Sequence, residues 1–236
     1  MKKRIWELDA LRGICILGMV IVHFMYDLVE LYRILDWEYP TWFTIPWQIG
    51  SVTFVVLSGL CVTLGSRSVR RGAIVFGCGM LVTAVTYGMY RFGFHHSIII
   101  YFGVLQCLGC CMLLWPVFRK LPWWALLILG GLLIWGGFYV RSLPRVDVYY
   151  LMPLGLPWEG FSSSDYFPLL PNLGYFLVGA ALGRTVYRKK ETLLPKVRED
   201  MGIVKFLCFC GRQSLWIYLL HQPVLSGICM ILQAVM

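Results

Sequence analysis

Long hydrophobic segments follow one another along the chain, separated by short stretches rich in basic residues, proline or glycine. Each segment is long enough to form a helix that crosses a hydrocarbon layer of about 30 Å. The predicted spans are 8–31, 45–65, 72–92, 98–118, 122–140, 167–187 and 213–234. The pattern therefore predicts an all-α polytopic membrane protein of about seven transmembrane helices, built as one domain over residues 1–236. The amphipathic stretch 203–212 predicts an interfacial helix leading into the last span.

The basic residues lie in alternate loops, as they do when they set membrane topology. The loops predicted to lie inside hold Arg67, Arg70, Arg71, Arg119, Lys120, Arg184, Arg188, Lys189, Lys190, Lys196 and Arg198. The outer loops hold Arg33, Arg91, Arg141 and Arg145. With Lys2, Lys3 and Arg4 at the start, this distribution predicts a cytoplasmic N-terminus and an external C-terminus.

The composition excludes several classes of protein. Hydrophobic residues make up 59% of the chain and charged residues 14%, whereas soluble domains have roughly a quarter charged residues. The net charge of +9 does not predict nucleic-acid binding, because the alternate loops already account for it. The first apolar run is too long for a cleavable signal peptide and lacks a small-residue cleavage site. We expect membrane lipids to surround most of the chain.

The nine cysteines all fall in apolar segments, and their number is odd. Cys107, Cys110 and Cys111 superficially resemble a metal or redox motif, but no second cluster of matching spacing accompanies them. We predict that the cysteines pack as small apolar residues, with no structural disulfide and no metal. His95 and His96 are adjacent and therefore point in different directions, so we predict surface residues rather than a metal pair.

The first span carries Asp9 and Arg12 near its start and His23 and Asp27 near its far end. Ionisable residues are costly in a membrane and are therefore usually functional. His23 and Asp27 are four residues apart, so they share a helix face and can hydrogen-bond. A carboxylate behind an imidazole fixes its tautomer and raises its basicity, as a general base requires. Asp9 and Arg12 form a predicted ion pair at the start of the helix. That pair either shapes a phosphate-binding entrance or locks the helix start.

Other spans contain polar groups at depths similar to that of His23. These residues are Gln106, Asn172 and His221. If these side chains face one another, they form a polar chamber open to the outside. Alternatively, they form hydrogen bonds that hold neighbouring helices together. Gln48 and Ser58 fit the second interpretation better. His221 is followed by Gln222-Pro223, which predicts a helix break that frees a backbone carbonyl.

One long outer loop runs from Arg141 to Tyr166 and is rich in aromatic residues and proline. Long loops in compact proteins are usually functional or disordered. Trp158 and Asp165 are candidates for binding a sugar or peptide acceptor. The alternative is an aromatic belt at the membrane interface.

Several stretches together resemble a known family, and their order along the chain makes the match specific. The first has Arg4, Asp9 and Arg12-Gly13, then an apolar run and His23. The others are Phe54–Gly59, Arg70-Arg71-Gly72, Tyr101–Gln106, Asp165–Pro171, Gly179–Arg184 and Gly211–Pro223. The chain resembles a small bacterial member of the heparan-α-glucosaminide N-acetyltransferase catalytic-domain family, within the transmembrane acyltransferases.

The resemblance implies an enzyme of the bacterial cytoplasmic (inner) membrane. Family members transfer an acyl group, usually acetyl, from acyl-CoA to an amino or hydroxyl group of a saccharide on the far side of the membrane, without a metal. Related O-acyltransferases use as base the histidine that matches His23. The heparan-glucosaminide enzymes have asparagine there and a histidine in the next segment, where this chain has Asp36 and Glu38. This chain has fewer spans than the larger members, which leaves a homo-oligomeric site open.

The resemblance also implies roles for the polar residues. We expect acyl-CoA (acetyl-CoA) to bind near Arg12, Arg70 and Arg71, with Asp9 paired to Arg12. His23, oriented by Asp27, then deprotonates the acceptor, by direct attack or through an acyl-histidine. Donors to the developing oxyanion would be Gln106, Asn172 or His221.

Two other functions stay open from the sequence. A proton-coupled transporter or channel would use His23, Asp27 and His221 as a path through the membrane, although no internal repeat supports it. A non-catalytic membrane subunit would bind lipid or a protein partner.

Overall fold

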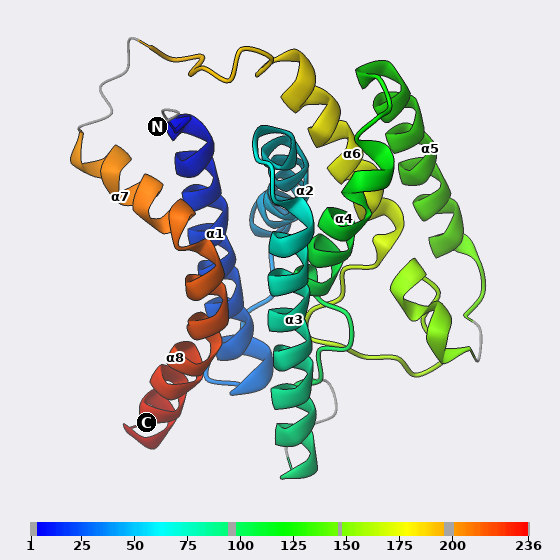
Figure 1. Cartoon of the computed structure of the whole chain (residues 1–236). Coiled ribbons are helices and arrows are strands. Elements are labelled where there is room, and N and C mark those ends of the chain that lie inside the picture. The colour runs from blue at the N-terminus through cyan, green and yellow to red at the C-terminus, as the bar shows by residue number, and fades with distance from the viewer. Residues whose placement is uncertain (1–3, 94–97, 146–147, 196–200, 236) are drawn as a thin grey trace. The chain divides into compact units, whose positions relative to one another are not determined.

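The computed structural model describes residues 4–93, 98–145, 148–195 and 201–235 (Figure 1). Lys2, Lys3, His95, His96, Lys196 and Arg198 lie outside the described residues, so the predictions made for them stay predictions. Contacts divide the chain into two compact units. Unit 1 comprises residues 1–54 and 190–236, and unit 2 comprises residues 55–189. Each unit is described by itself, and the single domain over 1–236 also stays a prediction.

Unit 1 is built around the first helix. Helix α1 (Trp6–Tyr26) continues into a π-helical turn (Asp27–Leu31), and the first part of α2 (Thr41–Leu64) follows. The C-terminal helices α7 (Gly202–Arg212) and α8 (Ser214–Val235) belong to the same unit and contact α1 (Figure 1).

Glycines let α1 and α7 approach closely. A Cβ atom at Gly13 would collide with the Leu207 carbonyl, and one at Gly211 with the Asp9 carbonyl. Small residues allow this kind of backbone contact between membrane helices. The start of α1 is also tied to the segment before α7, because Glu7 accepts hydrogen bonds from the Thr192 hydroxyl and the Leu193 N–H, both at 2.8 Å.

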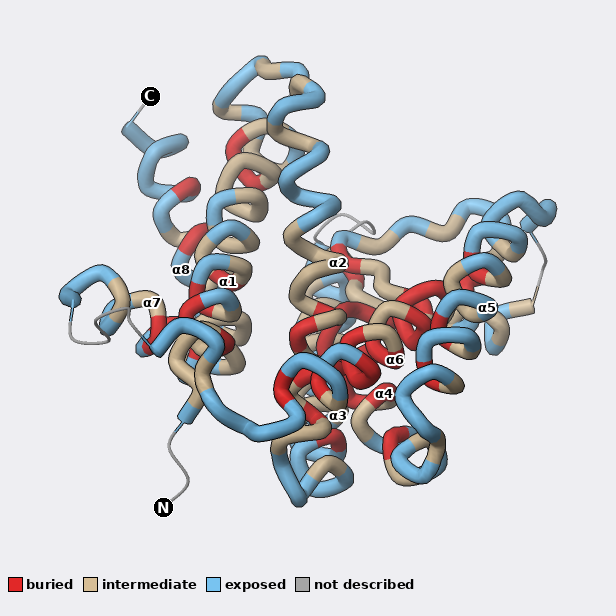
Figure 2. The backbone as a smooth tube through the Cα atoms, turned by 90° about the horizontal axis from the view of Figure 1, so that it is seen from above, coloured by how far each residue is buried: buried red, intermediate tan, exposed pale blue. Residues whose placement is uncertain are grey.

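Unit 2 contains two antiparallel helix pairs. It comprises the second part of α2, α3 (Ser68–Arg91), α4 (Val104–Phe118), α5 (Trp123–Ser142), a 3-10 helix (Tyr149–Leu154) and α6 (Leu169–Thr185). Helix α3 packs on α4, and α5 packs on α6. The buried residues of this unit are concentrated in α4 and α6, which form its centre (Figure 2). The second part of α2 packs on α6, where Gly59 meets Phe176 and Gly179 meets Val56.

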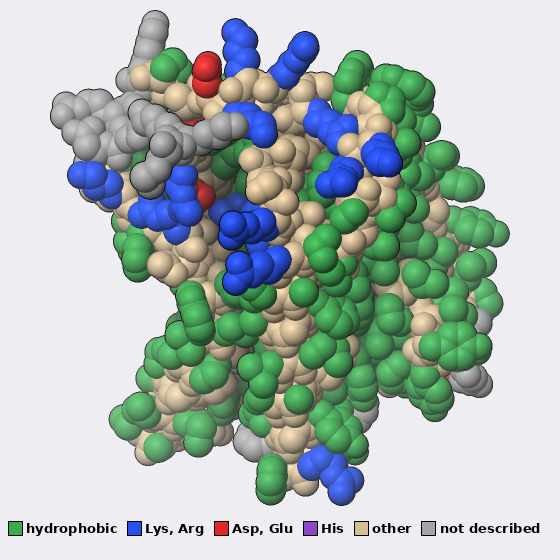
Figure 3. Space-filling model, viewed as in Figure 1, with side chains coloured by type: hydrophobic (Ala, Val, Ile, Leu, Met, Phe, Trp, Pro, Cys, Tyr) green, Lys and Arg blue, Asp and Glu red, His purple; other side chains and the backbone are tan. Residues whose placement is uncertain are grey.

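The helix surfaces fit a membrane environment. Five helices among the described residues are long and apolar enough to cross a membrane: α1 with its π turn, α2, α3, α5 and α8. Large hydrophobic side chains remain exposed along them, and Figure 3 shows green side chains covering the flanks of α3 and α5. A soluble protein rarely exposes so much apolar surface, so the fold is that of a helical polytopic membrane protein.

The predicted helices are present, with changes at some ends. Each of the seven predicted spans coincides with a helix, and the predicted interfacial segment coincides with α7. The fourth span, predicted from residue 98, is helical only from Val104. The predicted break at Gln222-Pro223 is wrong, because α8 runs continuously through Pro223. Helices α4 and α6, with 15 and 17 residues, are shorter than the five candidate spans, so the seven-span topology stays a prediction.

Candidate functional site

His23 is held in one orientation by its own helix. Its Nδ1 lies 3.1 Å from the Met19 carbonyl oxygen and 2.8 Å from the Met19 sulfur. A carbonyl oxygen can only accept, so Nδ1 carries the hydrogen and Nε2 is the basic nitrogen of the neutral ring. Nε2 has no hydrogen-bond partner among the described residues. The ring is therefore preset to take a proton at Nε2.

His221 lies beside His23 within unit 1. The two ring centroids are 4.9 Å apart, with the planes tilted by 54°. Nδ1 of His221 is hydrogen-bonded to the Tyr218 carbonyl, so its basic nitrogen is also Nε2. Helices α1 and α8 thus bring together two imidazoles that are nearly 200 residues apart in the sequence.

The predicted hydrogen bond between His23 and Asp27 is not made. Nδ1 of His23 faces Met19, and the Asp27 carboxylate accepts instead from Gln222 Nε2, at 2.8 Å to Oδ1 and 2.9 Å to Oδ2. Asp27 is fully buried, so its carboxylate requires a donor inside the protein. Sequence spacing placed Asp27 on the face of His23, but α8 supplies a better-placed donor.

A π-helical turn begins at Asp27. The Tyr32 N–H donates to the Asp27 carbonyl at 2.8 Å, five residues back, where an α-helix would bond four residues back. Such turns occur mostly as single insertions in α-helices and often at functional sites. Nothing in the hydropathy pattern signals this turn.

Gln106, predicted to bind substrate, is fully engaged inside unit 2. Its Nε2 donates to the Gly79 carbonyl at 2.9 Å and to the Thr83 hydroxyl at 2.7 Å, while its Oε1 accepts from the Gly103 N–H at 3.0 Å. The side chain is 1% exposed. These bonds join α4 to α3 and cap the start of α4, which matches the helix-bonding interpretation of Gln106.

Asn172 and Asp165 also bond within unit 2. The Asn172 side chain donates to the Pro168 carbonyl at 2.8 Å. Asp165 is buried, and its Oδ2 accepts from the Val104 N–H at 2.9 Å, the first residue of α4. A carboxylate at a helix N-terminus is favoured by the helix dipole. Asp165 therefore fixes the loop before α6 to the start of α4.

The aromatic residues of the long loop stack on one another. Trp158 contacts Phe161, Tyr149 and Tyr101, with centroid distances of 4.7, 4.9 and 5.3 Å, and Phe161 contacts Tyr166 at 4.8 Å. Burial raises the pKa of Tyr166 to about 12, so its hydroxyl stays protonated and donates to the Met152 carbonyl at 2.6 Å. The loop is thus packed around its own rings, with Trp158 half-buried among them.

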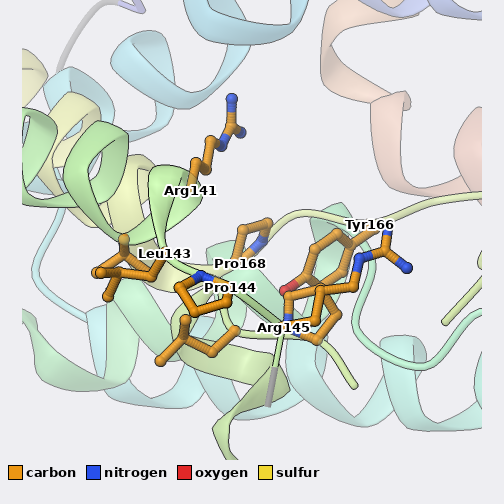
Figure 4. Close-up of a pocket in the computed structure, with 10 residues that line it drawn as sticks. Arg141, Leu143, Pro144, Arg145, Tyr166 and Pro168 are labelled. Atoms are coloured by element: carbon orange, nitrogen blue, oxygen red, sulfur yellow. The ribbon is translucent and has the colours of Figure 1, made fainter. Parts of the chain in front are cut away.

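A cavity of about 180 Å³ lies between the end of α5 and this loop (Figure 4). Pro144, Pro168 and Tyr166 form part of its wall, and Arg141 and Arg145 also line it. Neither arginine has a carboxylate partner within the described ranges. Nothing in the sequence pattern predicts this cavity, because its walls come from three separate segments, residues 140–145, 155–157 and 166–168.

The predicted phosphate contacts fall in both units. In unit 1, Asp9 lies 3.5 Å from Arg12 and 3.7 Å from Arg4, so one carboxylate contacts two guanidinium groups. In unit 2, Arg70 and Arg71 are exposed in the first turn of α3. Cations at a helix N-terminus are disfavoured by the dipole, so an anion there would be favourable.

Arg184, grouped with the inner arginines, has a structural role instead. Its guanidinium donates to the backbone carbonyls of Leu121 and Arg119 and lies over the Trp115 ring, 5.2 Å from the centroid. It therefore satisfies carbonyls that follow the end of α4.

The structure thus brings His23, Asp27, His221 and Gln222 together in unit 1. Gln106, Asn172, Asp165 and Trp158 lie in unit 2, each bonded or stacked locally. Gln222 was not among the predicted site residues, because the sequence marks it only by its position before Pro223. Its placement next to His221 was the available signal.

Apolar helices that carry a half-buried histidine pair beside the buried carboxylate of Asp27 define a polytopic membrane protein with a polar site. The chain belongs to the family described as heparan-alpha-glucosaminide N-acetyltransferase, catalytic, which matches residues 4–223. It is therefore a membrane acetyltransferase by family, as the sequence motifs predicted. Comparison with curated proteins and with solved structures gave no match.

Proposed function

We propose that the protein transfers an acetyl group from acetyl-CoA to an amino or hydroxyl group of a saccharide outside the cytoplasm, with His23 as the base. Family membership supports the reaction class. The observation that carries the assignment is His23 itself, whose Nδ1 is bonded to Met19 and whose Nε2 is left basic. The cytoplasmic membrane of a bacterium is the proposed location.

The proposed step conserves atoms and charge. Nε2 of His23 takes the proton of the acceptor N–H or O–H as that atom attacks the thioester carbonyl. The new bond to the acetyl carbon forms while the carbon–sulfur bond breaks, and the CoA thiolate then receives the proton from His23. A positioned base of this kind contributes about 10²- to 10⁴-fold to the rate.

The length of α1 suits a site in which Arg12 contacts the phosphates of acetyl-CoA and His23 lies at the thioester. Because α1 is one continuous helix, Arg12 and His23 are separated by about 16 Å along its axis. Arg12 is the proposed phosphate contact on this helix. We propose that the inner end of α1 meets the phosphates of acetyl-CoA and that the far end meets the thioester.

The test uses the purified protein in detergent with acetyl-CoA and an amino-sugar or polysaccharide mixture. Release of the CoA thiol and labelling of the acceptor are measured for the wild type, His23→Ala and the exposed control Gln48→Ala. We expect His23→Ala to lose at least about 100-fold in kcat and the control to match the wild type. Full activity in His23→Ala would contradict the role of His23.

The contact of two imidazoles also favours a second candidate function, a proton path in a transporter or channel. Neighbouring histidines can pass a proton between them. This function requires pH-dependent flux in liposomes and no consumption of acetyl-CoA. The same purified protein therefore decides between the two.

A further inference from the structure

The bond between Asp27 and Gln222 joins the π-helical turn at the end of α1 to α8, at the level of the histidine pair. The Asp27 carboxylate is fully buried, and Gln222 is its only hydrogen-bond donor among the described residues. Both carboxylate oxygens face the same Nε2. A buried carboxylate is costly without a donor, so this bond strongly favours one placement of α8 against α1.

The bond and the ring contact form a matched pair. His23 lies in the last turn of α1 and Asp27, four residues later, begins the π-helical turn, while His221 and Gln222 are consecutive on α8. Asp27 accepts a hydrogen bond from Gln222, and the His23 ring contacts the His221 ring, with the two centroids 4.9 Å apart. A rotation or slide of α8 that broke the first contact would also separate the rings.

We infer that Asp27 and Gln222 are positioning residues: their bond fixes His221 beside His23, and Asp27 acts on the reaction through Gln222. This inference rests on the proposed function, because it concerns the geometry of the proposed base. It differs from a carboxylate behind the imidazole, since the Nδ1 hydrogen of His23 is already given to Met19. A shift of about 1 Å in a reacting group can cost about 100-fold in rate, so a positioning bond has a measurable effect.

A positioning role for Asp27 and a role as the carboxylate behind the His23 imidazole make opposite predictions for Asp27→Asn. The asparagine oxygen still accepts from Gln222, so the positioning role predicts a loss of only a few-fold. Asp27→Leu and Gln222→Leu break the bond, and we expect each to lower kcat by about 10- to 100-fold with little change in the KM for acetyl-CoA. Gln233→Leu makes the same change at an exposed position of α8 and serves as the matched control.

Two double variants test the bond itself. Asp27→Leu with Gln222→Leu should be no less active than either single variant, because the second change removes nothing more. Gln222→Glu places two carboxylates together, and Asp27→Asn should restore activity to it because the amide and the carboxylate are exchanged. A structural role alone would not produce this rescue of kcat.

Several outcomes would overturn the inference. It is wrong if Asp27→Asn loses as much activity as Asp27→Leu, if Gln222→Leu keeps the wild-type kcat, or if the exchanged pair gives no rescue. The melting temperature of every variant is measured in parallel, and non-additive shifts for the Asp27 and Gln222 changes are expected even without turnover. An inactive wild type with that coupling intact refutes the proposed function, whereas additive melting shifts refute the bond.

Discussion

Gln106 commits every hydrogen-bonding atom of its amide to the protein, while His23 keeps one ring nitrogen basic. The difference separates polar residues that stabilise unit 2 from those available for chemistry in unit 1. Asn172 and Asp165 resemble Gln106 in this respect, because each bonds a backbone group in its own unit. A polar residue inside a membrane helix is therefore a catalytic candidate only after its partners are known.

Replacing Gln106 tests this distinction. Gln106→Leu leaves the buried Gly103 N–H without its acceptor, which costs about 1–3 kcal/mol, and removes the bonds that join Gln106 to the Gly79 carbonyl and the Thr83 hydroxyl of α3. We expect a lower melting temperature in detergent, while Gln48→Leu at an exposed position leaves it unchanged. Stability equal to that of the wild type would show that these bonds are not formed.

Tyr166 gives a pH-dependent test at the same scale. Its pKa is raised to about 12, mainly by burial, from an unfolded value of about 10. The neutral phenol is the form favoured in the folded protein, so its contribution is complete below pH 10 and is lost as pH rises toward 12. We expect Tyr166→Phe to remove part of the loss of stability seen in the wild type between pH 10 and 12. Parallel curves for the two proteins would contradict this expectation.

At the scale of secondary structure, close contacts between helices determine how each unit packs. Helices α1 and α7 meet at Gly13 and Gly211, where backbone lies against backbone. Helices α4 and α6 are linked through Arg184, whose planar guanidinium bonds two carbonyls and lies over Trp115. Neither contact follows from hydrophobicity, because glycine and arginine contribute little to an apolar pattern.

The glycine contact predicts opposite effects for two similar changes in α1. Gly13→Ala forces α7 away from α1 and should cost about 1–3 kcal/mol. Gly18 has open space around its Cα, so Gly18→Ala should be neutral or stabilise the helix by up to about 1 kcal/mol. Unfolding in detergent, monitored by circular dichroism, measures both, and equal effects would argue against the α1–α7 contact.

The Arg184 contact predicts that charge alone is insufficient at this position. Arg184→Lys keeps the charge but loses the planar fork, so it should lower stability by about 1.5–3 kcal/mol. Arg188→Lys at an exposed position nearby is the control and should change little. Equal melting temperatures for Arg184→Lys and Arg188→Lys would contradict the contact of Arg184 with the two carbonyls.

At the scale of the whole molecule, the charge distribution and the helices give one topology to test. Within unit 2 the antiparallel pairs place the start of α3 near the end of α4, where Gly72 meets Met112. The bonds of Arg184 place the end of α6 at the same end. These ends carry the basic residues predicted to lie inside, so the helix packing agrees with the positive-inside rule.

Reporter fusions determine the topology directly. With seven spans, alkaline phosphatase joined after Met236 is exported and active, because its disulfides form only outside the cytoplasm. The same reporter after Lys190 should be inactive, and green fluorescent protein should give the reverse pattern. An inactive phosphatase at the C-terminus would mean an even number of spans.

The sequence by itself determined the class of fold and the family. Hydropathy is a local and strong signal, so each of the seven predicted spans coincides with a helix among the described residues, and the motifs from Arg4 to Pro223 identified the family. The tertiary structure decided which partner each polar residue takes. Asp27 and Gln222 are 195 residues apart, and Asp165 and Val104 are 61 apart, so no local pattern joins them. Spacing along one helix favoured His23 with Asp27, but hydrogen bonds depend on the orientation of donor and acceptor atoms, which only the packing of α8 against α1 fixes.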